Sequence, residues 1–333
     1  MTEYYPAETI VEHYVKGKPF DSVVDYPRYW HGYLVILKPL LIFMEYKEIR
    51  ILNGILQIAL TILICVLLFK KGYKLAVVPY LLSYMMLMPA AMAKCFQFST
   101  CFYIFNFRCL ALLLSDNNEK RKRQAQVIFL YCGIMTAFFD YLTYPVSTFG
   151  IPMLFYLLLS AYDPAGSKLR DTIKNGLLWC IGYAGMWVSK WILAGIITKE
   201  NIIEDGLNAV RERTSNISPY GSETYSIYGC EILNYKTFFK TPVTILVIFV
   251  IGYFIFKCIK INKKTKEYTV KLLFPFFLIG IVPAVWYVFA LNHSTVHYWF
   301  TNKACIVSIM GIMLGLVCLI QSNRSEENPS QKG

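Results

Sequence analysis

Charged residues are scarce in this 333-residue chain, and that scarcity is the first constraint on what the protein is. Asp, Glu, Lys and Arg make up 16% of the residues and hydrophobic residues 56%, whereas an average soluble domain has about 25% charged residues. The sequence also contains no phosphate-binding loop of the P-loop type. ATP-driven work is therefore not indicated.

Metal-binding and targeting motifs are missing as well. The ten cysteines form no CxxC pair, and no Cys/His cluster has metal-ligand spacing. Most of them lie in or beside apolar stretches, where cysteine is a small packing residue. Residues 1–32 have no cationic start, apolar core or cleavage site of a signal peptide.

Apolar runs of membrane-crossing length fill the chain instead, since a span needs about 20 residues. A run such as ILNGILQIALTILICVLLF has no polar face, which argues against a soluble all-helical protein. We therefore predict an all-α integral membrane helical bundle of about nine transmembrane helices plus interfacial helices. The predicted spans are 51–69, 75–93, 97–114, 126–143, 147–162, 176–196, 242–258, 271–291 and 304–320.

Lys and Arg predict the orientation of the bundle, because short cytoplasmic loops are enriched in them. With nine alternating spans, the basic links 70–74, 115–124, 163–175 and 257–271 fall on one side. We predict that this side is cytoplasmic, with the C-terminus there and the N-terminus external, in the plasma membrane. The formal charge of +12 then reflects topology and attraction to anionic lipids, not nucleic-acid binding.

The predicted organisation is one membrane domain between two terminal segments. Residues 1–50 form an external segment with a short interfacial helix at 33–43, and 51–320 form the transmembrane domain. Residues 321–333 are polar and predicted to be a disordered cytoplasmic tail. Nothing visible carries the polar N-terminus across a membrane, so we expect either that an upstream span is missing or that the first span inserts with its N-terminus outside and carries the segment through.

The long external loop, 197–241, has two halves of different character. In KENIIEDGLNAVRER the residues Ile203, Leu207 and Val210 follow one helical face and charges fill the other. This predicts an amphipathic helix on the outer surface. The following residues, TSNISPYGSETYSIYG, read as irregular loop.

Apart from Lys257 and Lys271 at the ends of their spans, three charged residues fall inside predicted spans, where charge is costly. Asp140 lies near the outer end of its span, and Lys190 lies between Trp187 and Trp191. Arg108 lies toward the inner half of the third span. Asp140 has the alternative of a salt bridge or helix cap, and the two cations have the alternative of snorkelling to the headgroups.

All four histidines are predicted on the external side. His31 follows Arg28 and Trp30, and His293 and His297 are four residues apart, so one helical turn would align them. That pair alone is weak evidence for a metal, and a hydrogen-bonding or substrate-contacting role is favoured. The aromatic residues near these histidines also fit an outer interfacial belt.

Four separated segments carry a family resemblance. YPRYWHGYLVILKPLLIF, AFFDYLTYP, GYAGMWVSKWILA and NHSTVHYWFTNKA resemble a group of uncharacterised polytopic bacterial membrane proteins, and that group is similar to the GT-C glycosyltransferases. The resemblance covers roughly residues 5–320. It implies a catalytic carboxylate in the first external loop, just after the first span, and we expect that span and the start of that loop to be missing from this sequence. That acid is therefore not carried over to a residue of this chain.

The resemblance implies transfer of a sugar from a polyprenyl-phosphate donor to a cell-envelope acceptor at the outer face. An acceptor hydroxyl attacks the anomeric carbon while a base takes its proton, and positive charge stabilises the leaving phosphate. That charge comes from side chains or from a divalent cation such as Mg²⁺, and the sequence leaves the choice open. The predicted catalytic residues are Asp140 and His31. The predicted substrate-binding residues are Arg28, Trp30, Tyr141, Lys190, His293 and His297, with the bilayer and the lipid-linked sugar as partners.

Two other functions remain open from the sequence. A transporter or flippase for a lipid or envelope precursor would show paired halves and broken helices meeting at mid-membrane, and no paired halves are visible. An inactive fragment or scaffold would explain the missing upstream span.

Overall fold

A computed structural model gives an all-helical bundle, and it describes residues 12–13, 15–17, 27–115, 117–162, 168–218, 221, 223–261 and 265–327. The predicted segment 1–50 is therefore described mainly from residue 27 onward, and the tail residues 328–333 lie outside the described part. The only β-pairing among these residues is an isolated bridge between Ile217 and Thr224. The predicted all-α helical fold is confirmed.

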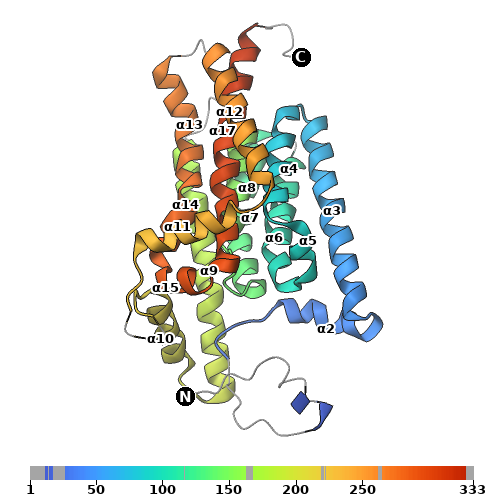
Figure 1. Cartoon of the computed structure of the whole chain (residues 1–333), viewed down its shortest axis with the longest axis vertical. Helices are drawn as coiled ribbons and strands as arrows, with labels where there is room; N and C mark the ends of the chain where they lie inside the picture. The colour runs from blue at the N-terminus through green and yellow to red at the C-terminus, as the bar shows by residue number, and fades with distance from the viewer. Residues whose placement is uncertain are drawn as a thin grey trace.

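The chain alternates long helices with short ones (Figure 1). In order, they are α2 (Tyr33–Phe43), α3 (Tyr46–Lys70), η1 (Lys74–Ala76), α4 (Val77–Met86), α5 (Pro89–Lys94), α6 (Phe96–Leu113), α7 (Asn118–Phe139), α8 (Ser147–Leu159), α9 (Lys168–Thr198), α10 (Ile202–Thr214), α11 (Ile227–Phe238), α12 (Val243–Ile261), α13 (Lys266–Gly280), α14 (Val282–Phe289), α15 (Leu291–Val296), α16 (Tyr298–Thr301), η2 (Asn302–Cys305) and α17 (Ile306–Glu327).

Six helical segments among the described residues are long and apolar enough to cross a membrane. They are Tyr46–Lys70, Phe96–Leu113, Lys168–Thr198, Val243–Ile261, Lys266–Phe289 and Tyr298–Asn323. By length and composition, these segments mark the chain as a multi-pass membrane protein. Large apolar side chains stay exposed along them, such as Ile245 (78%) and Phe249 (71%) on α12, as expected for a surface in contact with lipid.

The predicted count of nine spans is not confirmed, and the three remaining runs show why. The run 75–93 is broken where Met88 takes a left-handed conformation (φ 56°) before Pro89. The run 147–162 forms α8, whose 13 residues span only about 20 Å. The helix over 126–143 is α7, which begins at Asn118 in a strongly charged turn and ends at Phe139.

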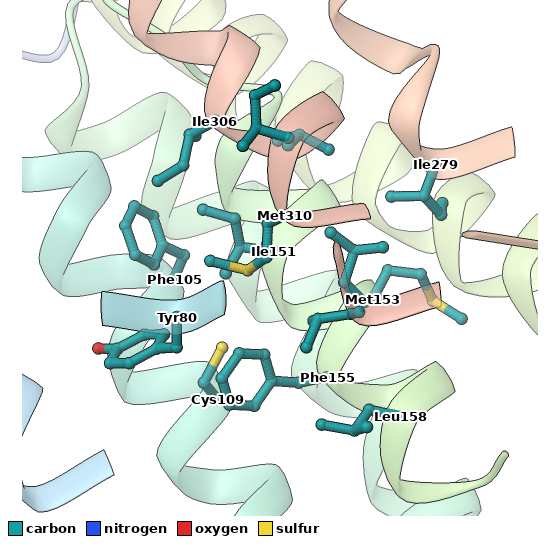
Figure 2. Close-up of a cluster of buried hydrophobic side chains, with 14 of the residues drawn as sticks. Tyr80, Phe105, Cys109, Ile151, Met153, Phe155, Leu158, Ile279, Ile306 and Met310 are labelled. Carbon is teal, nitrogen blue, oxygen red and sulfur yellow. The ribbon is translucent and has the colours of Figure 1, made fainter. Parts of the chain in front are cut away.

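The core of the bundle is formed around α8 and α17. Every residue of α8 is buried, as expected for a helix that is hydrophobic all round. Figure 2 shows Ile151 and Phe155 of α8 among side chains of α6 and α17, including Phe105 and Met310. The short α8 thus lies at the centre of the bundle, where it packs against α6, α7 and α17. Helix α13 packs against α17.

Two ends of the bundle differ in content. One end holds α2, α10 and α15, and we call it the α10 end; the other holds the C-terminal part of α17 (Figure 1). The predicted short helix at 33–43 is present as α2, and the predicted amphipathic helix as α10. The predicted irregular second half of the loop overlaps a helix at its end, because α11 begins at Ile227. Helix α17 continues to Glu327, past the predicted start of the tail at residue 321.

Candidate functional site

A large apolar cavity lies between α9, α10 and α14. Its volume is about 780 Å³. One wall is an aromatic ladder on α9, formed by Trp179, Tyr183, Trp187 and Trp191 at four-residue spacing, with successive ring centroids 4.9, 6.3 and 6.3 Å apart. The opposite wall comes from α14 and includes Trp286. We call this space the aromatic cavity.

Helix α10 covers part of the aromatic cavity at the end where the polar residues gather. It contacts α9 through Gly206, where an added Cβ would lie only 2.5 Å from the Trp191 ring. Glycine is thus needed for the helices to approach this closely. Leu207 and Val210, two residues of the predicted apolar face, line the cavity, although both stay partly exposed.

Two arginines lie at this end of the aromatic cavity and flank one tyrosine. Arg213 donates from Nε to the Tyr29 hydroxyl at 3.0 Å, and its Cζ lies 5.6 Å from the Tyr29 ring centroid. Arg28 has its Cζ 5.4 Å from the same ring, and its Nη1 donates to both carboxylate oxygens of Asp205, at 2.8 and 3.0 Å. The segment before α2 is thus tied to α10 at both ends of that helix.

His293 is held in one tautomer by its two contacts. Arg213 donates to Nδ1 at 2.9 Å, and since arginine has only donors, Nδ1 must be the acceptor. Nε2 therefore carries the proton and donates it to the carbonyl oxygen of Leu142 at 2.7 Å. Burial, aided by the nearby Arg213, lowers the pKa of His293 to about 3, so the ring is neutral. We call Arg28, Tyr29, Arg213 and His293 the arginine–histidine cluster.

Several predicted site residues surround this cluster. Tyr141 packs between Tyr29, at 4.8 Å between ring centroids, and His31, on which it stacks at 5.2 Å. His31 has a positive φ of 48°, and burial lowers the pKa of its ring. Trp30 donates from Nε1 to the carbonyl of Met186 at 2.8 Å, and Lys190 Nζ lies 5.1 Å from a Trp30 ring centroid.

Asp140 is placed differently from the other predicted residues. It follows α7 and is 6% exposed. One carboxylate oxygen accepts from the Thr143 backbone N–H at 3.0 Å and the other from the Thr143 hydroxyl. Its carboxylate thus stabilises the turn after α7, and Asp140 is not part of the aromatic cavity wall.

His297 lies four residues after His293, just past the end of α15. The predicted alignment with His293 is present, with ring centroids 4.8 Å apart, and His297 stacks on Phe300 at 5.2 Å. Burial lowers the pKa of His297. Within the described residues, no group of three or more His, Cys, Asp or Glu side chains could hold a metal ion.

Of the predicted site residues, Arg28 and His293 line the aromatic cavity, and Tyr141 and His31 lie one layer behind. Sequence reasoning missed Arg213, Tyr29 and the aromatic ladder. The signals were present: Arg213 follows Val210 by three residues, which places a cation on the apolar face of α10, and the ladder repeats every four residues.

The fold and the site together define a class of protein: a polytopic helical membrane protein with an apolar cavity that ends in a cationic cluster. Comparison with family models, with curated proteins and with solved structures finds no match.

Proposed function

We propose that this protein is a GT-C-like glycosyltransferase of the plasma membrane that takes a sugar from a polyprenyl-phosphate donor. The observation that supports it is the aromatic cavity with arginines at its end. Such a cavity matches an amphiphile with a long apolar tail and an anionic head, which is the shape of a lipid-linked sugar phosphate.

The dimensions of the cavity favour a long tail over a small ligand. On α9 its wall runs from Gly176 to Trp191, which is about 23 Å along the helix axis. The ladder offers flat rings that pack against unsaturated chains without rearranging. The wall is almost entirely apolar until it reaches Arg28, Arg213 and His293, so the tail and head positions are distinct.

The cluster has the right chemistry for a phosphate. A guanidinium is always charged and presents donors in a fork that fits phosphate oxygens. Positive charge placed there stabilises the phosphate as it leaves the sugar. His293 keeps Arg213 oriented toward the cavity because its Nδ1 accepts one of the Arg213 donors.

Proton transfer is assigned to the residues behind the cluster. His31 is neutral near pH 7 because burial lowers its pKa, and a neutral imidazole is the form that accepts a proton from an acceptor hydroxyl. Both carboxylate oxygens of Asp140 already bond Thr143, so we propose His31 as the base and give Asp140 the structural role of holding the turn after α7. In this arrangement the α10 end faces the cell exterior and the C-terminus lies in the cytoplasm.

The test is binding followed by transfer. Protein in nanodiscs is titrated with a polyprenyl phosphate and with the corresponding alcohol, and tryptophan fluorescence reports binding because Trp179, Trp187 and Trp286 line the cavity. We expect Arg213→Gln to weaken binding of the phosphate about tenfold. The matched control is Arg211→Gln, since Arg211 lies on the same helix but is exposed and bonds Asn208.

Transfer is then measured with a labelled polyprenyl-phosphate sugar, comparing wild type with His31→Asn and Asp140→Asn. We expect His31→Asn to abolish product formation while it retains binding of the donor. If the protein binds the lipid and moves it between leaflets without transferring the sugar, it is a transporter and not a glycosyltransferase. Equal affinity for phosphate and alcohol would refute the proposed head-group site.

A further inference from the structure

Lys303 is a buried lysine that the proposed active site does not use. It lies in η2, just before α17, and it is only 8% exposed. Within the part of the chain that the structure describes, no carboxylate forms an ion pair with it. A buried ammonium group is costly unless an anion accompanies it. The described residues supply the cation but not the anion.

The start of α6 lies beside Lys303. Its ammonium group is within electrostatic range of the thiol of Cys95, which is the N-cap residue of α6. Ring contacts hold the two segments together, because Phe98 in the first turn of α6 packs against Trp299 and Phe300, with centroids 5.9 Å apart in each pair. The buried lysine is therefore placed at the N-terminus of α6.

This N-terminus is itself favourable for an anion. Cys95 has an extended backbone, and its side chain does not cap the helix. The first N–H groups of a helix have no acceptor within it, and the helix dipole places partial positive charge there. Phosphates and other anions bind at such ends. Lys303 and the N–H groups of the first turn thus favour the same kind of ligand.

Two further donors lie close to Cys95. Lys94 directly precedes it, at the exposed end of α5, and has no ion pair with any carboxylate among the described residues. Tyr33, the first residue of α2, is within electrostatic range of Cys95, and a tyrosine hydroxyl can donate a hydrogen bond. We call Lys94, Lys303 and the first turn of α6 the α6 N-terminal site.

Charge decides which anion matches this site best. Each lysine carries one positive charge, and the helix end adds about half a charge. A carboxylate brings a single negative charge, whereas a phosphate monoester carries nearly two at neutral pH and has three acceptor oxygens. The phosphate monoester is therefore the closer match.

The α6 N-terminal site lies at the α10 end of the bundle. Helix α6 begins beside α2, which belongs to that end, and η2 follows α15 and α16 directly. Lys303 is five residues after the first residue of the membrane-crossing segment Tyr298–Asn323. A long side chain so close to the end of a span reaches the headgroup layer. Both lipid headgroups and soluble anions have access to this level.

We propose that the α6 N-terminal site binds a phosphate monoester group, held by Lys303, Lys94 and the N–H groups of the first turn of α6. Its source is either a phosphatidic acid headgroup in the leaflet at the α10 end or a soluble phosphate. None of these residues lines the aromatic cavity, so the site does not rest on the glycosyltransferase proposal.

The experiment is thermal unfolding of the full-length protein in nanodiscs, because a ligand that binds only the folded state raises the midpoint. In the first arm, phosphatidylcholine nanodiscs are compared in potassium phosphate and in potassium chloride of equal ionic strength. In the second arm, phosphatidic acid replaces part of the phosphatidylcholine, in chloride. A rise in the first arm identifies soluble phosphate as a ligand, and a rise in the second arm alone identifies the lipid headgroup.

Two variants test the lysines. We expect Lys303→Gln to increase the phosphate or phosphatidic acid needed for half of the rise about tenfold. Without either ligand, its midpoint should equal or exceed that of wild type, because an unpaired buried charge is gone. A merely structural lysine would instead lower the midpoint in every buffer. Lys94→Gln, at an exposed position, should weaken binding about threefold, and it keeps the test valid if Lys303→Gln does not fold.

Lys47→Gln is the matched control, since Lys47 is an exposed cation in the first turn of α3, at the same end but outside the site. It should behave as wild type. In an Arg213→Gln background, Lys303→Gln should still weaken the response, which separates this site from the arginine–histidine cluster. The proposal is overturned if neither arm raises the wild-type midpoint, if Lys303→Gln keeps the full rise, or if Lys47→Gln reduces the rise as much as Lys303→Gln does.

Discussion

At the scale of single residues, Arg213 joins segments that are far apart in the sequence. Its guanidinium bonds Tyr29, which precedes α2, and His293 on α15. A planar fork of donors can hold two acceptors at fixed angles, which a lysine cannot do. The geometry of the cluster therefore depends on arginine at this position.

The Tyr29 hydroxyl is the simplest contact to remove. We expect Tyr29→Phe to lower the free energy of unfolding by about 1 kcal/mol, the usual net value of one hydrogen bond, while the ring packing is kept. Thermal unfolding in detergent measures it. Tyr228→Phe is the matched control, because Tyr228 is 76% exposed. Equal midpoints for the two variants would contradict the role given to this hydroxyl.

The buried neutral His293 predicts a dependence of stability on pH. Its pKa is about 3 in the folded protein and about 6.5 in an unfolded chain. Between these values the unfolded state binds the extra proton, so stability falls as pH decreases below about 6.5, by at most about 1.4 kcal/mol per pH unit. The lowered pKa values of His31 and His297 act in the same direction.

Unfolding midpoints measured from about pH 7.5 to about pH 4.5 check this expectation, because this range crosses the reference pKa of histidine, about 6.5. His293→Gln removes the titrating ring and should make the curve shallower on the acid side. A variant that keeps the full wild-type slope would show that other groups cause the acid sensitivity.

At the scale of elements, α7 and α9 form the most extensive helix pair among the described residues. A Cβ on Gly133 would lie 2.1 Å from the Trp179 carbonyl oxygen, and one on Gly182 would lie 2.2 Å from that of Leu130. Small residues that allow backbones to touch are typical of helix pairs in membranes. This crossing sets the position of the aromatic ladder, because Trp179 and Tyr183 flank Gly182 on α9.

Gly133→Ala should push the two helices apart. The neighbouring atoms are backbone and cannot rotate away. We therefore expect the free energy of unfolding to fall by about 1–3 kcal/mol, as for overpacked cores. Gly185→Ala on α9 is the control, since nothing lies within 4 Å of its added Cβ. That variant should be neutral or slightly stabilising, because alanine favours helix. Comparable destabilisation by both changes would argue against the close crossing.

At the scale of the whole molecule, the proposed orientation places the basic links in the cytoplasm and the arginine–histidine cluster outside. Labelling of single introduced cysteines in intact cells tests it, in a background where the exposed Cys180 is replaced by serine. Ser215→Cys, next to α10, should react with a membrane-impermeant maleimide, and Lys120→Cys should react only after the cells are opened. The reverse pattern would place the proposed active site in the cytoplasm.

The helical class and most helix positions could be predicted from the sequence. Apolar length and the charge of the links are properties of each segment alone, and solvation in lipid acts on each segment alone. The amphipathic α10 and the short α2 were predicted for the same reason. The alignment of His293 with His297 also needs only the helical repeat.

The predicted count of nine spans is not confirmed, because the number of spans depends on contacts between segments. A 13-residue helix such as α8 is stable in a bundle when neighbours bury its entire surface, and the break at Met88 is a local backbone conformation that apolar composition does not encode. Hydropathy measures how unfavourable it is to expose a segment to water. It does not show whether the segment is surrounded by protein or by lipid.

The site divides in the same way. The sequence was enough to predict that one end of the bundle holds Arg28, His31, His293 and His297, because the charge of the loops assigns each loop to a side of the membrane. Only the tertiary structure decided that Arg213 joins Tyr29 to His293, that Asp140 bonds Thr143, and that the α9 ladder faces α14. Those pairings bring together residues up to 184 positions apart. They follow from how the helices pack, which no single segment determines.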